Sequence, residues 1–101
     1  MTTTLKAHEP ITPGEILLTE FLEPLGITQY RLAQATGLAQ TRISEIVRGK
    51  RAITTETGLR LSKALGVDDR FWINIQTDYN LEVERDLHQA ELDKVIILVA
   101  I

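Results

Sequence analysis

The chain has 101 residues, of which 44% are hydrophobic and 25% charged, the balance of one small globular domain rather than of a disordered chain. It contains no cysteine, which excludes disulfides and thiolate metal sites. The longest apolar run, residues 95–101, is too short to cross a bilayer, and no signal-peptide pattern is present, so we expect a cytoplasmic protein with no membrane partner.

The net charge of −3 is distributed unevenly along the chain. Residues 28–63 hold seven basic and two acidic side chains, a local net charge of +5. The flanking segments, 1–27 and 64–101, carry net charges of −3 and −5. A basic centre between acidic ends is typical of a domain that presents one face to phosphates, so nucleic acid is a candidate partner despite the acidic total.

The N-terminal residues predict an arm followed by a helix. Residues 1–10 are polar and predict a flexible arm. Thr12 suits a helix N-cap, Pro13 suits the first helical position, and Glu15 lies three residues after the cap. The first helix is therefore predicted to begin at Pro13, and Pro24 is expected to close it.

Two short helices joined by a tight turn are predicted next. Thr28 caps the second helix, and Gly37 suits the left-handed conformation that ends it. The third helix is predicted over residues 40–48, with Gly49 as its stop. Ala33 supplies the small side chain needed where two steeply crossing helices touch. This arrangement indicates a helix-turn-helix.

Two more helices are predicted after this pair. The fourth is capped by Thr54 or Thr55 and stops at Gly66, and the fifth begins after a cap at Asp68. The apolar residues of the fifth helix share one side: Phe71, Trp72, Ile75 and Tyr79.

The C-terminal part is less regular in pattern. Residues 81–94 are compatible with more helix, and the β-branched run 95–101 is compatible with a strand or a helix end. The fold class is thus all-α, with a five-helix domain over residues 11–80 and an extension over 81–101. The apolar run either closes the core of one copy or pairs with a second copy. We favour a dimer contact formed by the following residues: Trp72, Ile75, Tyr79, Val95 and Ile97.

The third helix carries the candidate recognition face. Ile43, Ile46 and Val47 fall on its inner side, whereas polar side chains of the kinds that hydrogen-bond base edges in the major groove fall on its outer side and flanks. A polar outer face is also the default for an amphipathic helix, and the face alone leaves both interpretations open. The candidate base-contacting residues are Gln40, Thr41, Arg42, Ser44 and Glu45.

With these elements in order, the chain resembles a known class of proteins. From Thr28 to Gly66 it is similar to phage-repressor-like helix-turn-helix proteins, through TQYRLAQATGL, QTRISEIVRGKRAIT and TGLRLSKALG. Within that class it resembles the HigA-type antitoxins, also known as virulence or plasmid-maintenance regulators, through ITPGE, GKRAIT and FWINIQTDYNL. The resemblance covers residues 11–87.

The resemblance implies a bacterial DNA-binding antitoxin without a cofactor. Such a protein binds a palindromic operator in double-stranded DNA as a homodimer, represses its own operon and neutralises a RelE-like, messenger-RNA-cleaving toxin by direct binding. Ala39 departs from the family pattern, in which Ser or Thr often caps the third helix. The residues that the resemblance places against phosphates are Thr28, Gln29, Arg48, Lys50 and Arg51.

The sequence also leaves other functions open. The alternative is a stand-alone transcriptional repressor of the same fold with no toxin partner. A protein-interaction module that does not bind DNA is a third hypothesis, disfavoured by the basic centre. No nucleophile arrangement or phosphate loop is present, and the acidic residues at 82–93 indicate a solvated helix face, so we expect neither catalysis nor a metal site.

Overall fold

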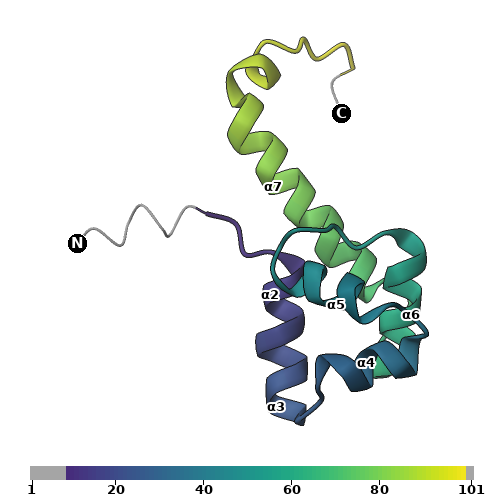
Figure 1. The fold of residues 1–101 in the computed structure, drawn as a ribbon. Helices are drawn as coiled ribbons and strands as arrows, with labels where there is room; N and C mark the ends of the chain where they lie inside the picture. The colour runs from purple at the N-terminus through teal and green to yellow at the C-terminus, as the bar shows by residue number, and fades with distance from the viewer. Residues whose placement is uncertain (1–8, 100–101) are drawn as a thin grey trace.

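The computed structural model describes residues 9–99, and the regular elements within that range are helices. The first three follow one another without a break and form one continuous helix, so the described part of the chain contains five helices (Figure 1). The elements are α2 (Pro13–Ile16), the π-helix η1 (Leu17–Leu22), α3 (Glu23–Leu25), α4 (Gln29–Thr36), α5 (Gln40–Val47), α6 (Thr55–Leu65) and α7 (Phe71–Asp93). The predicted all-α fold is confirmed.

The first helix starts as predicted but ends later. The Thr12 hydroxyl accepts the Glu15 backbone N–H at 3.1 Å, which confirms the cap. The prediction that Pro24 closes the helix is wrong, because the helix continues to Leu25 and stops at Gly26, whose φ is 67°. In the π-helix the Glu23 N–H bonds to the carbonyl of Leu18, five residues back. This wider turn lies directly before Pro24. Because Pro24 has no backbone N–H, one helical hydrogen bond is missing, and the loss is confined to the last turn of the helix.

The caps of the middle helices agree with the predictions. Thr28 caps α4, which ends at Gly37 with a φ of 76°. Thr54, rather than Thr55, caps α6, since its hydroxyl accepts the Thr57 N–H at 3.2 Å. α5 begins without a side-chain cap, because an alanine occupies the N-cap position.

The last helix differs from the prediction at its start and follows one predicted alternative at its end. Asp68 does not cap it: its carboxylate accepts the Arg70 N–H at 2.8 Å and forms a separate turn, and α7 begins at Phe71. α7 reaches Asp93 with a kink at His88, where φ is −124° and ψ is 21°, so the helical alternative for the start of the extension is confirmed. Residues 95–99 form neither helix nor strand and are exposed, so they do not close the core of one copy. Most of the predicted arm, 1–8, and residues 100–101 lie outside the described range.

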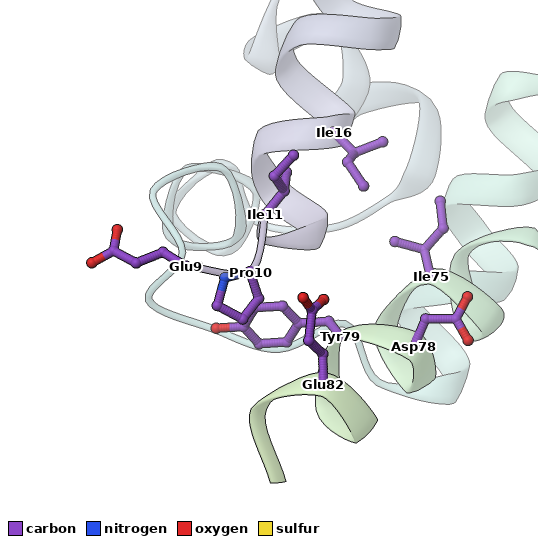
Figure 2. Close-up of a pocket in the computed structure, with 8 residues that line it drawn as sticks. All are labelled: Glu9, Pro10, Ile11, Ile16, Ile75, Asp78, Tyr79 and Glu82. Atoms are coloured by element: carbon purple, nitrogen blue, oxygen red, sulfur yellow. The ribbon is translucent and has the colours of Figure 1, made fainter. Parts of the chain in front are cut away.

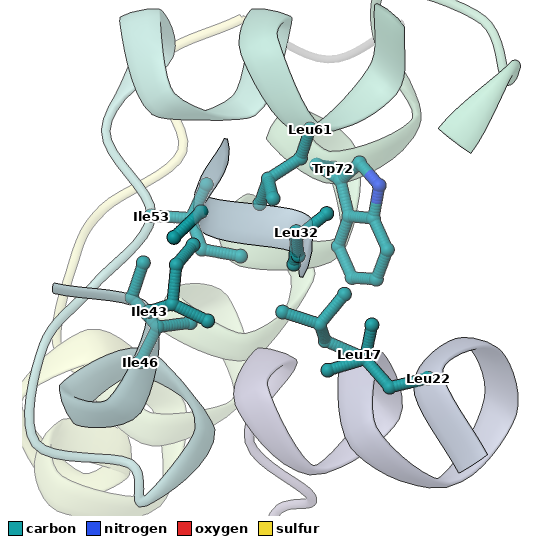
Figure 3. Packing of buried hydrophobic residues seen from close by; sticks show 9 residues of the cluster. Leu17, Leu22, Leu32, Ile43, Ile46, Ile53, Leu61 and Trp72 are labelled. Carbon is teal, nitrogen blue, oxygen red and sulfur yellow. The ribbon is translucent and has the colours of Figure 1, made fainter. Parts of the chain in front are cut away.

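Every helix contributes to one hydrophobic core (Figure 3). Trp72 of α7 is fully buried in it, and its ring lies 5.1 Å from the ring of Phe21, centroid to centroid. Because Trp72 has no exposed surface, it cannot touch a second copy, and the prediction that it lies at a dimer contact is wrong. The buried aliphatic side chains around it are Leu17, Leu22, Leu32, Ile43, Ile46, Ile53 and Leu61.

The C-terminal part of α7 extends beyond the helical bundle (Figure 1). Leu87 on this part is 68% exposed, and the five residues 95–99 are between 68% and 91% exposed. In the described part of the chain, no helix is long and apolar enough to cross a membrane.

Candidate nucleic-acid interface

The turn between α4 and α5 is held by hydrogen bonds on both sides. The buried Thr36 hydroxyl donates to the Leu32 carbonyl at 2.8 Å and accepts the Leu38 N–H at 3.3 Å. From α6, Arg60 Nη1 donates to the Thr36 carbonyl at 2.7 Å. Arg60 therefore closes the C-terminal end of α4, and this cation of the basic centre has a structural role.

The inner side of α5 packs into the core and leaves its polar side accessible. Ile43 and Ile46 are 0% and 1% exposed. Gln40 and Thr41 are exposed at the N-terminal end of α5. The other three predicted base-contacting residues, Arg42, Ser44 and Glu45, are partly exposed. The structure thus places all five on α5, as the sequence predicted.

The backbone of α2 seats the C-terminal end of α5. A Cβ atom on Gly14 would lie 1.6 Å from the carbonyl oxygen of Ile46, so only glycine permits this approach. Thr12 packs beside Gly49, the residue that ends the turn after α5. The segment ITPGE is therefore a contact surface for α5 as well as a helix start.

Two predicted phosphate-binding arginines are bonded to two predicted base-contacting residues. Arg48 Nη1 donates to the Ser44 hydroxyl at 2.9 Å. Arg51 Nε donates to a carboxylate oxygen of Glu45 at 2.7 Å, with the two side chains 48% and 36% exposed. Each bond uses one N–H of its guanidinium, so the others are available to an acceptor outside the protein. The arginines are thus held beside the C-terminal end of α5.

The N-terminal end of α4 also presents polar groups. The Thr28 hydroxyl accepts the Arg31 N–H at 3.0 Å and keeps its own hydrogen available to donate, whereas the Gln29 side chain is partly buried. Tyr30 is 58% exposed, and its hydroxyl accepts from Gln34 Nε2 at 2.9 Å.

Tyr30 and Gln34 border a hollow of about 360 Å³ together with Gln40 of α5. Sequence reasoning did not select either residue. The sequence feature that could have identified them is a tyrosine hydroxyl and a glutamine amide four positions apart on the outer side of the second helix.

The loop after α5 is linked to α7 by Gln76 and Asn80, two residues that sequence reasoning missed. Gln76 is 7% exposed, and its Oε1 accepts the backbone N–H of Ile53 at 2.8 Å. Its Nε2 donates to Asn80 Oδ1 at 2.9 Å. Gln76 lies one helical turn after Trp72, where the amphipathic pattern of the helix predicts a buried apolar residue. A polar residue at such a position was the feature of the sequence that could have identified Gln76.

A groove beside the first helix and α7 has a different character (Figure 2). It has a volume of about 470 Å³ and lies between residues 9–11, the first helix and α7. Its lining includes apolar side chains such as Ile75 and Tyr79, and its three charged lining residues are all acidic: Glu9, Asp78 and Glu82. Such acidic side chains repel phosphates. Within residues 9–99, no group of three His, Cys, Asp or Glu side chains is placed to hold a metal ion.

The arrangement of α4 and α5 agrees with the comparison with known proteins. The helix-turn-helix family pattern matches residues 18–72. Virulence-associated protein I of Dichelobacter nodosus is 46% identical over 84 residues, covering 83% of this chain and 72% of that protein. Antitoxin HigA-1 of Vibrio cholerae is 39% identical over 84 residues, covering 83% and 79% of the two chains. The chain belongs to the helix-turn-helix family, in its HigA-type branch.

The structural comparison agrees with this assignment. The antitoxin HigA of Pseudomonas aeruginosa, whose structure was solved with the higBA promoter, superposes with a TM-score of 0.82 at 31% sequence identity. The alignment covers 89% of this chain and 99% of that one. In this HigA-type chain, ITPGE seats α5 through Gly14, and FWINIQTDYNL supplies both the core Trp72 and the loop-binding Gln76.

Proposed function

We propose that this protein is a DNA-binding antitoxin that binds a palindromic operator as a dimer, represses its own operon and neutralises a RelE-like toxin. Its site of action would be the bacterial cytoplasm, where operator DNA and messenger RNA are found. The observation that carries the proposal is α5, whose polar side is accessible beside three basic residues: Arg48, Lys50 and Arg51. Relatives named as antitoxins, and a neighbour solved with its promoter, support it.

The proposed DNA contacts divide into two groups. Gln40, Thr41, Arg42, Ser44 and Glu45 contact bases in the major groove. The residues that contact phosphates are Thr28, Gln29, Arg48, Lys50 and Arg51, to which we add Tyr30. Tyr30 is included because its hydroxyl accepts from Gln34 and keeps its own hydrogen for a phosphate oxygen.

The DNA part of the proposal is tested by titrating the protein against the DNA upstream of its own gene. We expect binding at least about 10³-fold tighter than to a shuffled duplex of the same composition, and a steep decrease in affinity as salt rises. Equal affinity for the two duplexes would show that the protein is not a sequence-specific regulator.

The toxin part rests on a surface that does not suit DNA. The groove lined by Glu9, Asp78 and Glu82 combines acidic with apolar side chains, which fits a basic protein segment bearing apolar side chains. Co-expression with the product of the neighbouring reading frame is expected to give a stable complex and to suppress cleavage of messenger RNA. The alternative, a stand-alone repressor, is supported if operator binding occurs but no complex forms.

The groove has its own test with matched charge changes. Reversal of Asp78 and Glu82 to Arg is expected to weaken the toxin complex at least 10-fold in a pull-down titration. Reversal of Glu20 and Glu23, exposed acids outside the groove lining, should leave the complex unchanged. Equal weakening by both pairs would show that overall charge matters rather than the groove.

A further inference from the structure

The loop between α5 and α6 carries the basic residues of the interface but packs little against the rest of the molecule. Residues 48–52 are all exposed, and Ile53 is the first residue after α5 that reaches the core, at 4% exposure. A hollow of about 170 Å³ lies beneath the loop, lined by Lys50, Arg51 and Ala52 on one side and by residues of α7 on the other. Hydrophobic packing therefore does not determine the shape of this segment.

A buried polar bond fixes the far end of the loop. Gln76 Oε1 accepts the Ile53 N–H at 2.8 Å across 23 residues of sequence. Because a backbone N–H can only donate, the amide oxygen of Gln76 must face Ile53 and its nitrogen must face α7. Asn80 Oδ1 accepts from that nitrogen at 2.9 Å and so keeps the amide in this orientation. No other side chain of the described residues bonds to the Ile53 N–H.

We propose that Gln76, oriented by Asn80, is a positioning residue for DNA binding. From α7 it holds the loop in the shape that presents Lys50 and Arg51 to the DNA backbone, while the Glu45 bond holds Arg51 from the α5 side. The inference rests on the proposed DNA-binding function and adds a residue that does not itself touch DNA. Its loss should affect the number of phosphate contacts, and hence the salt dependence of binding.

Three variants test this role. Gln76→Leu keeps the size but removes the acceptor, Gln76→Glu keeps an oxygen for Ile53, and Asn80→Ala removes only the group that orients the amide. The matched control is Gln89→Leu, because Gln89 makes the same kind of bond to a residue four positions later on α7, to Asp93 at 2.7 Å, but lies on the exposed outer part.

The measurement is the affinity for the gene's own upstream DNA between about 50 and 200 mM salt. We expect Gln76→Leu to weaken binding at least 10-fold and to lower the salt slope by about 1 to 2, the value of one or two lost phosphate contacts. Asn80→Ala should give a smaller loss of the same kind, Gln76→Glu should recover part of the affinity, and Gln89→Leu should match the unmodified protein. Hydrogen exchange of the Ile53 amide should speed up in Gln76→Leu and slow again in Gln76→Glu.

The outcomes separate the two levels of inference. If the unmodified protein does not prefer its own upstream DNA, the proposed function is wrong and the positioning role is wrong with it. If it does, and Gln76→Leu binds with unchanged affinity and salt slope, only the positioning role is overturned. Should Gln76→Leu fail to fold, as judged by circular dichroism, Asn80→Ala decides the question, and an unchanged salt slope in that folded variant overturns the role.

Discussion

Two exposed regions of the molecule differ in what holds their side chains. On the α5 side, Arg48 and Arg51 are exposed but bonded to Ser44 and Glu45. On the segment after α7, residues 95–99, the exposed side chains are all apolar, with Leu98 91% exposed. Polar groups held in place suit a ligand of fixed geometry such as duplex DNA. Exposed apolar groups gain only when another protein surface covers them.

The bonded polar side chains and the exposed apolar segment suit different kinds of partner. We propose that residues 95–99 pack against a second copy of the chain, and that α5 of each copy then meets one half-site of the operator. Ile75 and Tyr79 are only partly exposed and line the acidic groove, so their part in the dimer contact stays a prediction.

The largest expected effect comes from removing the large, fully buried Trp72 from the core that both regions share. Trp72→Ala should lower the free energy of unfolding by about 3–5 kcal/mol, because a fully buried ring is lost from the core that seats both α5 and α7. Urea unfolding followed by circular dichroism measures the change. Leu87→Ala, on the exposed part of the same helix, should change stability by less than about 0.5 kcal/mol. Similar losses of stability in both variants would contradict the distinction between the core and the exposed part of α7.

A second prediction breaks the proposed dimer while leaving the core intact. Val95→Asp combined with Ile97→Asp should halve the molecular mass measured by light scattering and reduce operator affinity at least 10-fold, since charges on the apolar segment oppose its burial. Thr77→Asp combined with Gln89→Asp adds the same charge to exposed positions of α7 and should leave the mass unchanged. A dimer that survives the first pair would place the contact elsewhere.

A third prediction separates base contacts from phosphate contacts. Thr41→Ala or Arg42→Ala should reduce discrimination between operator and mismatched DNA, by about 1–3 kcal/mol for a well-formed contact. Lys50→Ala should instead weaken binding to all sequences alike and lower the salt slope by about 1. Titrations against operator, mismatched and random duplexes distinguish these results. The reverse pattern would exchange the roles of the two groups.

The smallest expected effect concerns Glu45, the acidic residue among the predicted base contacts. Glu45→Gln should change the free energy of unfolding by less than about 1 kcal/mol, because its ion pair with Arg51 is exposed. Removing the negative charge should raise the affinity for random DNA a few-fold. The ratio of operator affinity to random-DNA affinity should therefore fall. If affinity for random DNA is unchanged while operator affinity falls, Glu45 acts through Arg51 alone.

Local chemistry in the sequence predicted most of the helix starts and stops. Thr28 and Gly37 bracket α4 as expected, since a hydroxyl cap and a left-handed glycine act within a few residues of the chain. The errors at Pro24 and Asp68 have the same origin. Each residue was assigned its usual local role, but the chain makes an additional turn at both places, a widened one before Pro24 and a separate one after Asp68.

The sequence by itself determined the helix-turn-helix and the side of α5 that is exposed, because amphipathic periodicity and capping depend on near neighbours. The tertiary structure decided what positions that helix: the approach of Gly14 to Ile46, and the bond from Gln76 to Ile53 across 23 residues. It also placed Trp72 in the core rather than at a dimer contact. Contacts between residues far apart in the chain depend on how the helices pack, and periodicity within one helix does not specify that packing.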